Sequence, residues 1–88
     1  MWSIEVLREA ARDLEKLDRQ HVIRILKFLH DRVSKLQDPR TLGAALKGSK
    51  LGRYWKYRVG DYRIISQIED ERLLILVLRV GHRREVYR

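Results

Sequence analysis

The sequence predicts an α+β fold in which a helical hairpin covers one face of a largely antiparallel sheet. Two observations carry this prediction. Apolar residues recur at helical spacing between positions 7 and 36, and from position 53 onward they alternate with polar residues at the two-residue period of strands. A short alternating segment at positions 2–6 precedes both regions, so the expected order of elements is β-α-α-β-β-β.

The chain has 88 residues, and we expect residues 1–88 to form a single domain. A domain of this size has a thin core, so its stability can depend on a partner. It contains no cysteine, which excludes a disulfide framework and a cysteine-based zinc site. The N-terminus does not resemble a signal peptide, and the longest apolar run, Leu73–Leu78, is too short to span a membrane. These features suit a cytoplasmic protein.

Trp2–Val6 is expected to be a short strand. Helical periodicity begins at Leu7 and marks a first helix that ends near position 17. Asp18 stands where a second helix needs an N-cap, and Asp38-Pro39 should end that helix, because a residue before proline avoids the helical conformation. Two helices this close in sequence should form an antiparallel hairpin. Their apolar stripes are Leu7, Ala10, Ala11, Leu14 and Leu17 in the first and Val22, Ile25, Leu26, Leu29, Val33 and Leu36 in the second.

Residues 41–52 are expected to form a connector between the helices and the strands. This segment contains three glycines, which favour irregular backbone. Its apolar residues Leu42, Ala45 and Leu46 should hold the connector to the core.

The period of two after the connector predicts three strands. Gly60-Asp61 should form a two-residue hairpin turn, because glycine accepts the positive φ that such a turn needs. Asp70-Glu71 is expected to be the second turn. The strands are expected at Arg53–Val59, Tyr62–Glu69 and Arg72–Val80, and the nearly continuous apolar sequence of the last indicates a central strand.

Charge gives the first indication of function. Twenty Lys and Arg residues against twelve Asp and Glu residues leave a net charge of +8. Residues 1–46 carry nine basic and seven acidic groups, whereas residues 47–88 carry eleven and five. A surplus concentrated in one half of a chain is typical of a surface that binds a polyanion, and a nucleic acid or an acidic protein would fit it. P-loop, dinucleotide and serine-nucleophile motifs do not occur, and the histidines lack the spacing of metal ligands.

The expected hairpin brings three cations to one face of the sheet. A two-residue loop pairs Arg58 with Arg63, and directly paired residues point to the same face. Lys56 shares this face because it lies two residues from Arg58, and Tyr54 follows by the same rule. Like charges placed opposite each other are destabilising, so we expect the arrangement to serve phosphate binding. The alternative is that the cations point into solvent or pair with acidic residues of the helices.

The C-terminal tail adds Tyr87 to the cations. An aromatic ring beside cations can stack an unpaired base while the cations hold its backbone. Alternatively, Tyr87 is a partly packed ring near the chain end. The other face of the hairpin is expected to be core and contains Trp55, Tyr57, Val59, Tyr62, Ile64 and Ile68.

Residues 56–65, the apolar strand after them, the segment Arg79–Arg83 and Tyr87 resemble the RelE branch of the RelE/ParE toxin superfamily. Leu46-Lys47-Gly48 is similar to the Leu-x-Gly element of that family. The resemblance implies the toxin of a type II toxin–antitoxin system, a ribosome-dependent endoribonuclease that cleaves messenger RNA in the A site. The 2′-hydroxyl of the RNA attacks the adjacent phosphate, and no metal or other cofactor is used. The implied partners are the ribosome, the messenger and a small acidic antitoxin similar to RelB.

Carried over by position, the resemblance assigns functional roles to Lys56, Arg58, Arg63, Arg83 and Tyr87. We expect Arg63 to stabilise the charge on the phosphorane and Arg83 to serve the leaving 5′-oxygen. Lys56 is the better candidate for the general base, because the guanidinium of Arg58, which replaces a frequent family lysine, stays protonated. Tyr87 is expected to stack the base. Further RNA contacts are expected from Lys47, Lys50, Arg53, Tyr54, Arg84 and Arg88.

Two other functions stay open on the sequence. A ParE-like toxin would inhibit DNA gyrase instead of cutting RNA, although such chains tend to lack the full set of strand cations with a terminal tyrosine. A non-catalytic relative would keep the fold and bind RNA, with its cations splayed apart.

Overall fold

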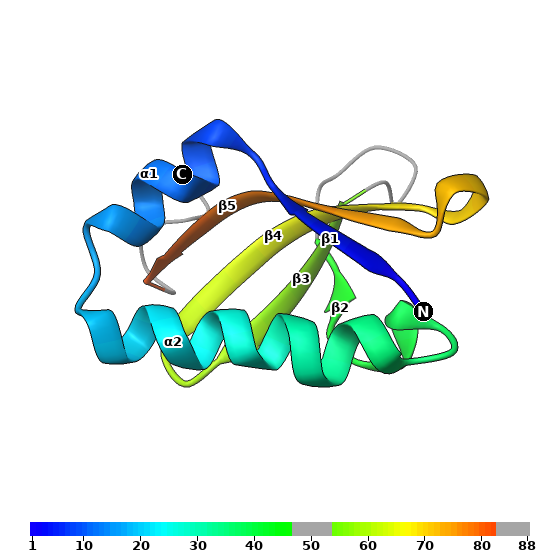
Figure 1. Cartoon of the computed structure of the whole chain (residues 1–88), viewed down its shortest axis with the longest axis horizontal. Helices are drawn as coiled ribbons and strands as arrows, with labels where there is room; N and C mark the ends of the chain where they lie inside the picture. Colours follow the sequence, from blue (N-terminus) through cyan, green and yellow to red (C-terminus); the bar gives the residue numbers. More distant parts are fainter. Residues whose placement is uncertain (47–53, 83–88) are drawn as a thin grey trace.

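The computed structural model describes residues 1–46 and 54–82. Within these residues five strands form one sheet in the order β1-β5-β4-β3-β2. Strand β1 runs parallel to β5, and the other neighbouring strands are antiparallel (Figure 1). The predicted α+β fold is confirmed. The strands are β1 (Ser3–Val6), β2 (Ala44–Ala45), β3 (Tyr54–Val59), β4 (Tyr62–Glu69) and β5 (Leu74–His82).

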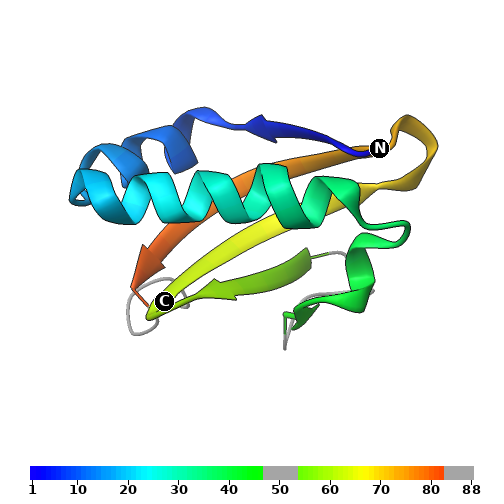
Figure 2. The same cartoon turned by 60° about the horizontal axis from the view of Figure 1, so that its bottom comes forward.

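The helices between β1 and β2 form the predicted hairpin, which packs on one side of the sheet (Figure 2). Helix α1 (Arg8–Glu15) is followed by α2 (Arg19–Lys27), which continues through a π turn, η1 (Phe28–Arg32), and a 3-10 turn, η2 (Val33–Lys35). In the part of the chain that the structure describes, no helix has the length and apolar character needed to cross a membrane.

The core lies between the α2 segment and the sheet. Ile25, Leu29 and Val33 recur along one side of this segment and are at most 1% exposed. They contact the inward residues of the three longest strands, as the helical and two-residue periods predicted. The buried cluster consists of Trp2, Ala10, Ile25, Leu29, Val33, Tyr57, Ile64, Ile75, Val77 and Val80.

Helix α1 covers the edge of β5 beyond the end of β1. β1 pairs with β5 as far as Val77. Further along, the Asp13 carboxylate accepts hydrogen bonds from the backbone N–H of Val80 and from Arg79 Nε, both at 2.9 Å. Burial by itself would raise the pKa of Asp13, but the bonds from Arg79 and Val80 outweigh it and hold the pKa below its ordinary value of 3.8. A helix carboxylate thus completes the hydrogen bonding of the strand.

The second helix ends earlier and less regularly than Asp38-Pro39 predicted. α2 gives way to the π turn η1 and the 3-10 turn η2, after which Leu36 is extended. The Ser34 hydroxyl donates a hydrogen bond to the His30 carbonyl at 2.6 Å. Such a bond competes with the backbone N–H groups for the carbonyls of the last turn and distorts the helix there.

Of the two aspartates at predicted helix boundaries, Asp18 takes the expected position and Asp38 does not. Asp18 takes the N-cap position of α2, but its side chain makes no capping hydrogen bond. Asp38 does not end a helix; its side chain accepts from the Arg40 backbone N–H at 2.9 Å and caps a separate 3-10 turn, η3 (Pro39–Thr41). Proline suits the first position of that turn because no N–H is needed there.

Part of the predicted connector is a strand. β2 pairs antiparallel with β3, with Ala44 opposite Lys56 and Ala45 opposite Trp55. Leu42 packs against the core as predicted, but Ala45 is exposed, because β2 lies at the edge of the sheet. Two residues are too few to show the alternation on which strand prediction depends.

Strand β5 begins two residues later than predicted, because the second turn is longer. It also ends two residues later than predicted, at His82. The turn extends through the 3-10 turn η5 (Asp70–Arg72), and Leu73 takes a left-handed φ of 48°. A 2.9 Å hydrogen bond from Arg72 to Glu69 spans this turn. Arg72 therefore belongs to the turn and not to the strand.

We expect Asp13→Asn to lower the free energy of unfolding at neutral pH by about 1–3 kcal/mol, because hydrogen bonds to a charged group contribute on this order. The pKa of Asp13 is depressed in the folded state, so its contribution is present above 3.8 and is lost as the pH falls further. Urea unfolding of both proteins at about pH 7 and about pH 3 measures the difference, which should shrink at the lower pH. Glu15→Gln, on the exposed side of α1, removes the same charge and is the control.

Candidate functional site

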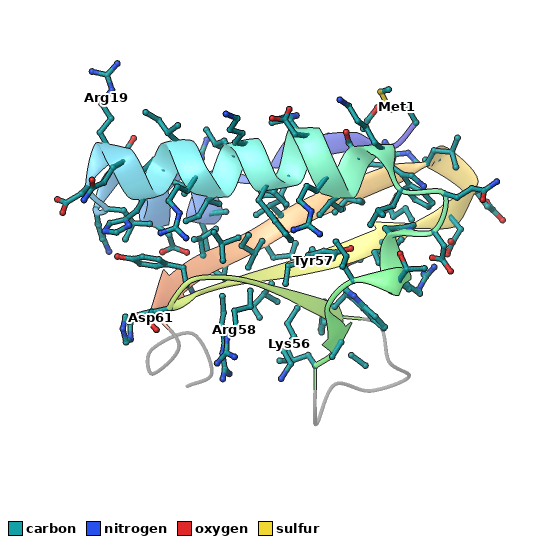
Figure 3. The ribbon with its side chains drawn as sticks, turned by 90° about the horizontal axis from the view of Figure 1, so that it is seen from below. Met1, Arg19, Lys56, Tyr57, Arg58 and Asp61 are labelled. Atoms are coloured by element: carbon teal, nitrogen blue, oxygen red, sulfur yellow. The ribbon has the colours of Figure 1, made fainter. Side chains whose placement is uncertain are left out.

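The β3–β4 hairpin carries three cations on the face of the sheet opposite α2. Gly60 has a φ of 59° in the two-residue turn, and Arg58 lies directly opposite Arg63, in the predicted register. Lys56 pairs with Ile65. Side chains alternate along a strand, so Lys56, Arg58 and Arg63 share one face. Figure 3 shows Lys56 and Arg58 pointing away from α2. The prediction of their common face is confirmed, and we call them the hairpin cations.

Tyr57 holds the hairpin from the other side. It points toward α2 in Figure 3 and is 1% exposed. Its hydroxyl donates a 2.7 Å hydrogen bond to the Pro39 carbonyl, and its ring lies 6.0 Å from that of Phe28. Burial raises the pKa of Tyr57, so the phenol stays protonated and keeps this bond. Lys56 and Arg58 therefore extend from a strand that is held in place by the buried Tyr57 between them.

The hairpin cations line a cavity of about 250 Å³ that opens to solvent. Gly43 and Ala44, near the beginning of the connector, and Tyr57 complete the lining. Lys56 and Arg63 are half-buried, whereas Arg58 is exposed. Fixed cations around a small cavity suit the binding of an anion, and guanidinium groups match the geometry of phosphate oxygens.

Arg79 lies next to the hairpin cations but is held by α1. It is opposite Ile65 across the β4–β5 pair. Besides its bond to Asp13, its guanidinium lies 3.9 Å from a Glu9 carboxylate oxygen. The hydrogen bond to Asp13 raises the pKa of Arg79. Two carboxylates thus offset the charge of Arg79, and we exclude it from the site.

The structure places part of the predicted site. Tyr54 begins β3 opposite Gln67 and is half-buried, two residues from Lys56 and on the same face. Seven other predicted residues lie outside the described residues, and their place in the site stays a prediction. They are Lys47, Lys50, Arg53, Arg83, Arg84, Tyr87 and Arg88.

The end of β5 lies beside the hairpin cations. Gly81 is opposite Arg63 across the β4–β5 pair, and His82 is opposite Tyr62. The Tyr62 ring lies 6.1 Å from that of His82 and 5.0 Å from that of His21 in α2. These aromatic contacts hold the end of β5 against β4 and α2.

Sequence reasoning missed the contribution of Gly43 and Ala44 to the cavity. The connector carries no charge in this part, and its approach to β3 arises from tertiary contacts. Its one local signal is the glycine itself, which has a φ of 76° that other residues rarely adopt.

In the part of the chain that the structure describes, a helical hairpin lies on one face of a five-stranded sheet and a cluster of cations on the other, which defines a small, basic α+β protein with a candidate anion site. Residues 4–87 match the family described as the ParE toxin of type II toxin-antitoxin system, parDE. The chain therefore belongs to this family of toxins.

Relatives of known name are toxins of the RelE type. The chain is 30% identical over 87 residues to toxin RelG of Mycobacterium tuberculosis, an alignment that covers 99% of this chain and 97% of the relative. It is 26% identical over 87 residues to toxin RelE of the same organism, covering 99% of this chain and 87% of the relative. These relatives confirm the predicted RelE branch of the RelE/ParE superfamily.

Solved structures agree with this assignment. A toxin–antitoxin complex, RelBE, from Mycobacterium tuberculosis superposes with a TM-score of 0.82 at 28% identity, covering 96% of this chain and 93% of the other. The isolated Escherichia coli RelE toxin superposes with a TM-score of 0.71 at 19% identity, covering 93% of this chain and 84% of the other, which shows the common fold.

We expect Arg58→Gln to raise the free energy of unfolding by about 0.2–1 kcal/mol at low salt, because like charges directly opposite in a strand pair are destabilising by about this amount. Salt screens the repulsion, so the gain should fall as ionic strength rises. Urea unfolding at low and high salt measures it. The matched control is Arg19→Gln, since Arg19 points away from the sheet in Figure 3. An equal gain in both variants would assign the effect to net charge instead of to the Arg58–Arg63 pair.

Proposed function

We propose that residues 1–88 act as one toxin domain that cleaves messenger RNA in the A site of the ribosome. The observation that carries this proposal is the convergence of Lys56, Arg58 and Arg63 around a cavity of about 250 Å³ that opens to solvent. The RelE-type relatives support the same branch of the family. Action on ribosomes would place the protein in the cytoplasm.

The proposed reaction needs stabilisation of negative charge. The 2′-hydroxyl oxygen of the RNA attacks the adjacent phosphorus, the bond to the 5′-oxygen breaks, and a 2′,3′-cyclic phosphate and a 5′-hydroxyl result. The phosphorane formed on the way carries more negative charge than the phosphodiester. Preorganised cations stabilise that additional charge and so lower the barrier. We assign this role to Arg63, which is half-buried in the cavity wall and held in a central strand.

The attacking 2′-hydroxyl and the leaving 5′-oxygen each need a further group. The attacking hydroxyl must lose a proton, and Lys56 is the proposed acceptor because Arg58 stays protonated. Arg58 then supplies fixed positive charge beside the phosphate. Arg83 is the proposed cation that stabilises the charge on the leaving 5′-oxygen while that oxygen takes a proton from water, and Tyr87 is the proposed stacking residue for the base. With these assignments the side chains of the protein perform the reaction without a metal ion.

We expect Arg63→Gln to lower cleavage of messenger on programmed ribosomes by about 100- to 1,000-fold, because loss of one group that stabilises a developing oxyanion has an effect of this size. Primer extension on the messenger measures the cuts. Arg19→Gln removes the same charge from the outer side of α2 and should cut like the unmodified protein. Equal cutting by Arg63→Gln would contradict the assigned role, and Arg83→Ala and Tyr87→Phe test the two tail residues in the same assay.

The match to the ParE toxin family favours inhibition of DNA gyrase as the second candidate function. The two functions predict opposite results in two assays. An endoribonuclease cuts messenger and leaves supercoiling by gyrase unchanged. Arrested supercoiling together with intact messenger would replace the proposed function with the second candidate.

We further propose that an acidic antitoxin similar to RelB neutralises this toxin. The net charge of +8 and the exposed Arg58 of β3 favour an acidic partner. Toxins of this fold from Mycobacterium tuberculosis and Escherichia coli have been solved as complexes with such partners, which supports the proposal.

Co-expression with a small acidic protein encoded beside the toxin gene should give a complex that survives purification and suppresses messenger cleavage. Attraction between opposite charges is screened by salt, so the affinity should fall as ionic strength rises. Calorimetric titration at two salt concentrations measures this dependence. An affinity that does not change with salt would contradict an interface based on charge.

A further inference from the structure

Residues 39–42, which lead into β2, are fastened to β3 by hydrogen bonds from two aromatic side chains. Tyr57 donates its hydroxyl hydrogen bond to the Pro39 carbonyl at 2.7 Å. Trp55 Nε1 donates to the Leu42 carbonyl, also at 2.7 Å. Both rings pack against the core, and Tyr57 also lines the cavity. The aromatic side chains of β3 therefore determine where residues 39–42 lie.

Gly43 lies between Leu42, which accepts the second bond, and the start of β2, and its backbone approaches β3 closely. A Cβ atom on Gly43 would lie 2.2 Å from the Lys56 carbonyl oxygen and 2.8 Å from Trp55 Nε1. It would lie 3.0 Å from Tyr57 Cδ1 as well. All three atoms are backbone or part of a hydrogen-bonded side chain, so they have little freedom to move. Any side chain at position 43 would push this part of the connector away from the backbone of Lys56.

We propose that Gly43 is a positioning residue of the phosphate site. Its missing side chain lets the connector lie against the backbone of Lys56, where Gly43 and Ala44 form the wall of the cavity facing the hairpin cations. This inference deepens the proposed function, because the cavity is the one assigned to the scissile phosphate. Displacement of a wall by about 1 Å is enough to lower catalysis by about 100-fold when reacting groups must be aligned.

Gly60 offers a matched control for Gly43. Both glycines have positive φ, at 59° for Gly60 and 76° for Gly43, so alanine introduces backbone strain at both positions. A Cβ on Gly60, however, would meet its nearest atoms, those of the Arg24 guanidinium, at 3.6 Å, which is an ordinary contact with a flexible side chain. Gly43→Ala differs from Gly60→Ala by its clash with the Lys56 carbonyl oxygen and the Trp55 ring of β3.

Messenger cleavage on programmed ribosomes and thermal unfolding should be measured for both variants. We expect Gly43→Ala to lower kcat/KM by about 100-fold and Gly60→Ala to change it by less than about threefold, although both lose thermal stability. Equal loss of cleavage in the two variants would overturn the proposal, because strain alone would then explain it. Unchanged cleavage by a folded Gly43→Ala protein would overturn it as well.

Titration with inorganic phosphate gives a readout that does not depend on the proposed function. The NMR signals of the Arg58 and Arg63 guanidinium groups report binding in the cavity. We expect phosphate to bind Gly43→Ala about tenfold more weakly than Gly60→Ala. If the unmodified protein cuts no messenger but this difference is found, the proposed function fails and the role of Gly43 stands; equal phosphate affinity would overturn that role.

Trp55→Phe is the second variant, in case Gly43→Ala does not fold. It keeps an aromatic ring in the core and removes the N–H that holds the Leu42 carbonyl. We expect phosphate affinity and cleavage to fall by about 2- to 10-fold, the effect of one hydrogen bond. A folded Trp55→Phe protein with unchanged phosphate affinity would overturn the proposal that the connector positions the site.

Discussion

The surface chemistry of this protein depends on the register of the β3–β4 hairpin. Side chains alternate along both strands, so a slip of one residue would turn Tyr57 and Ile64 out to solvent and bring Arg58 and Arg63 into the core. Neither change is tolerable, because the buried tyrosine and isoleucine pack under α2 and the arginines are charged. The hydrophobic contacts on one face of the hairpin thereby stabilise the cation arrangement on the other, including the repulsive Arg58–Arg63 pair.

Hydrogen bonds to backbone groups attach the remaining elements to this hairpin and its neighbour β5. The Asp13 carboxylate accepts a hydrogen bond from the Val80 N–H. Tyr57 and Trp55 donate hydrogen bonds to the carbonyls of Pro39 and Leu42. A polar group buried without a partner costs about 1–3 kcal/mol, so each bond favours a single position for the helix or connector that it holds. In a domain with a thin core, such bonds add to the hydrophobic contacts in specifying the fold.

Local sequence predicted the hairpin well, because a two-residue loop, Gly60-Asp61, separates two alternating segments. The length of this loop sets their register. The common face of Lys56, Arg58 and Arg63 followed from that register. Features that depend on contacts between distant segments were not predictable: β2 is too short for a pattern, and the parallel pairing of β1 with β5 leaves no local signal. The close approach of Gly43 to the Lys56 carbonyl exists only in the folded chain.

The two edges of the sheet are short, four residues in β1 and two in β2. A long, exposed strand edge is a template for pairing with another chain and leads to aggregation. Here α1 takes over where β1 ends, and β2 lies beside the hairpin cations, so a second molecule that approaches either edge of the described sheet meets a short strand and, at β2, charges of its own sign. The fold can therefore leave one sheet face open to a polyanion in a crowded cell while resisting self-association through its edges.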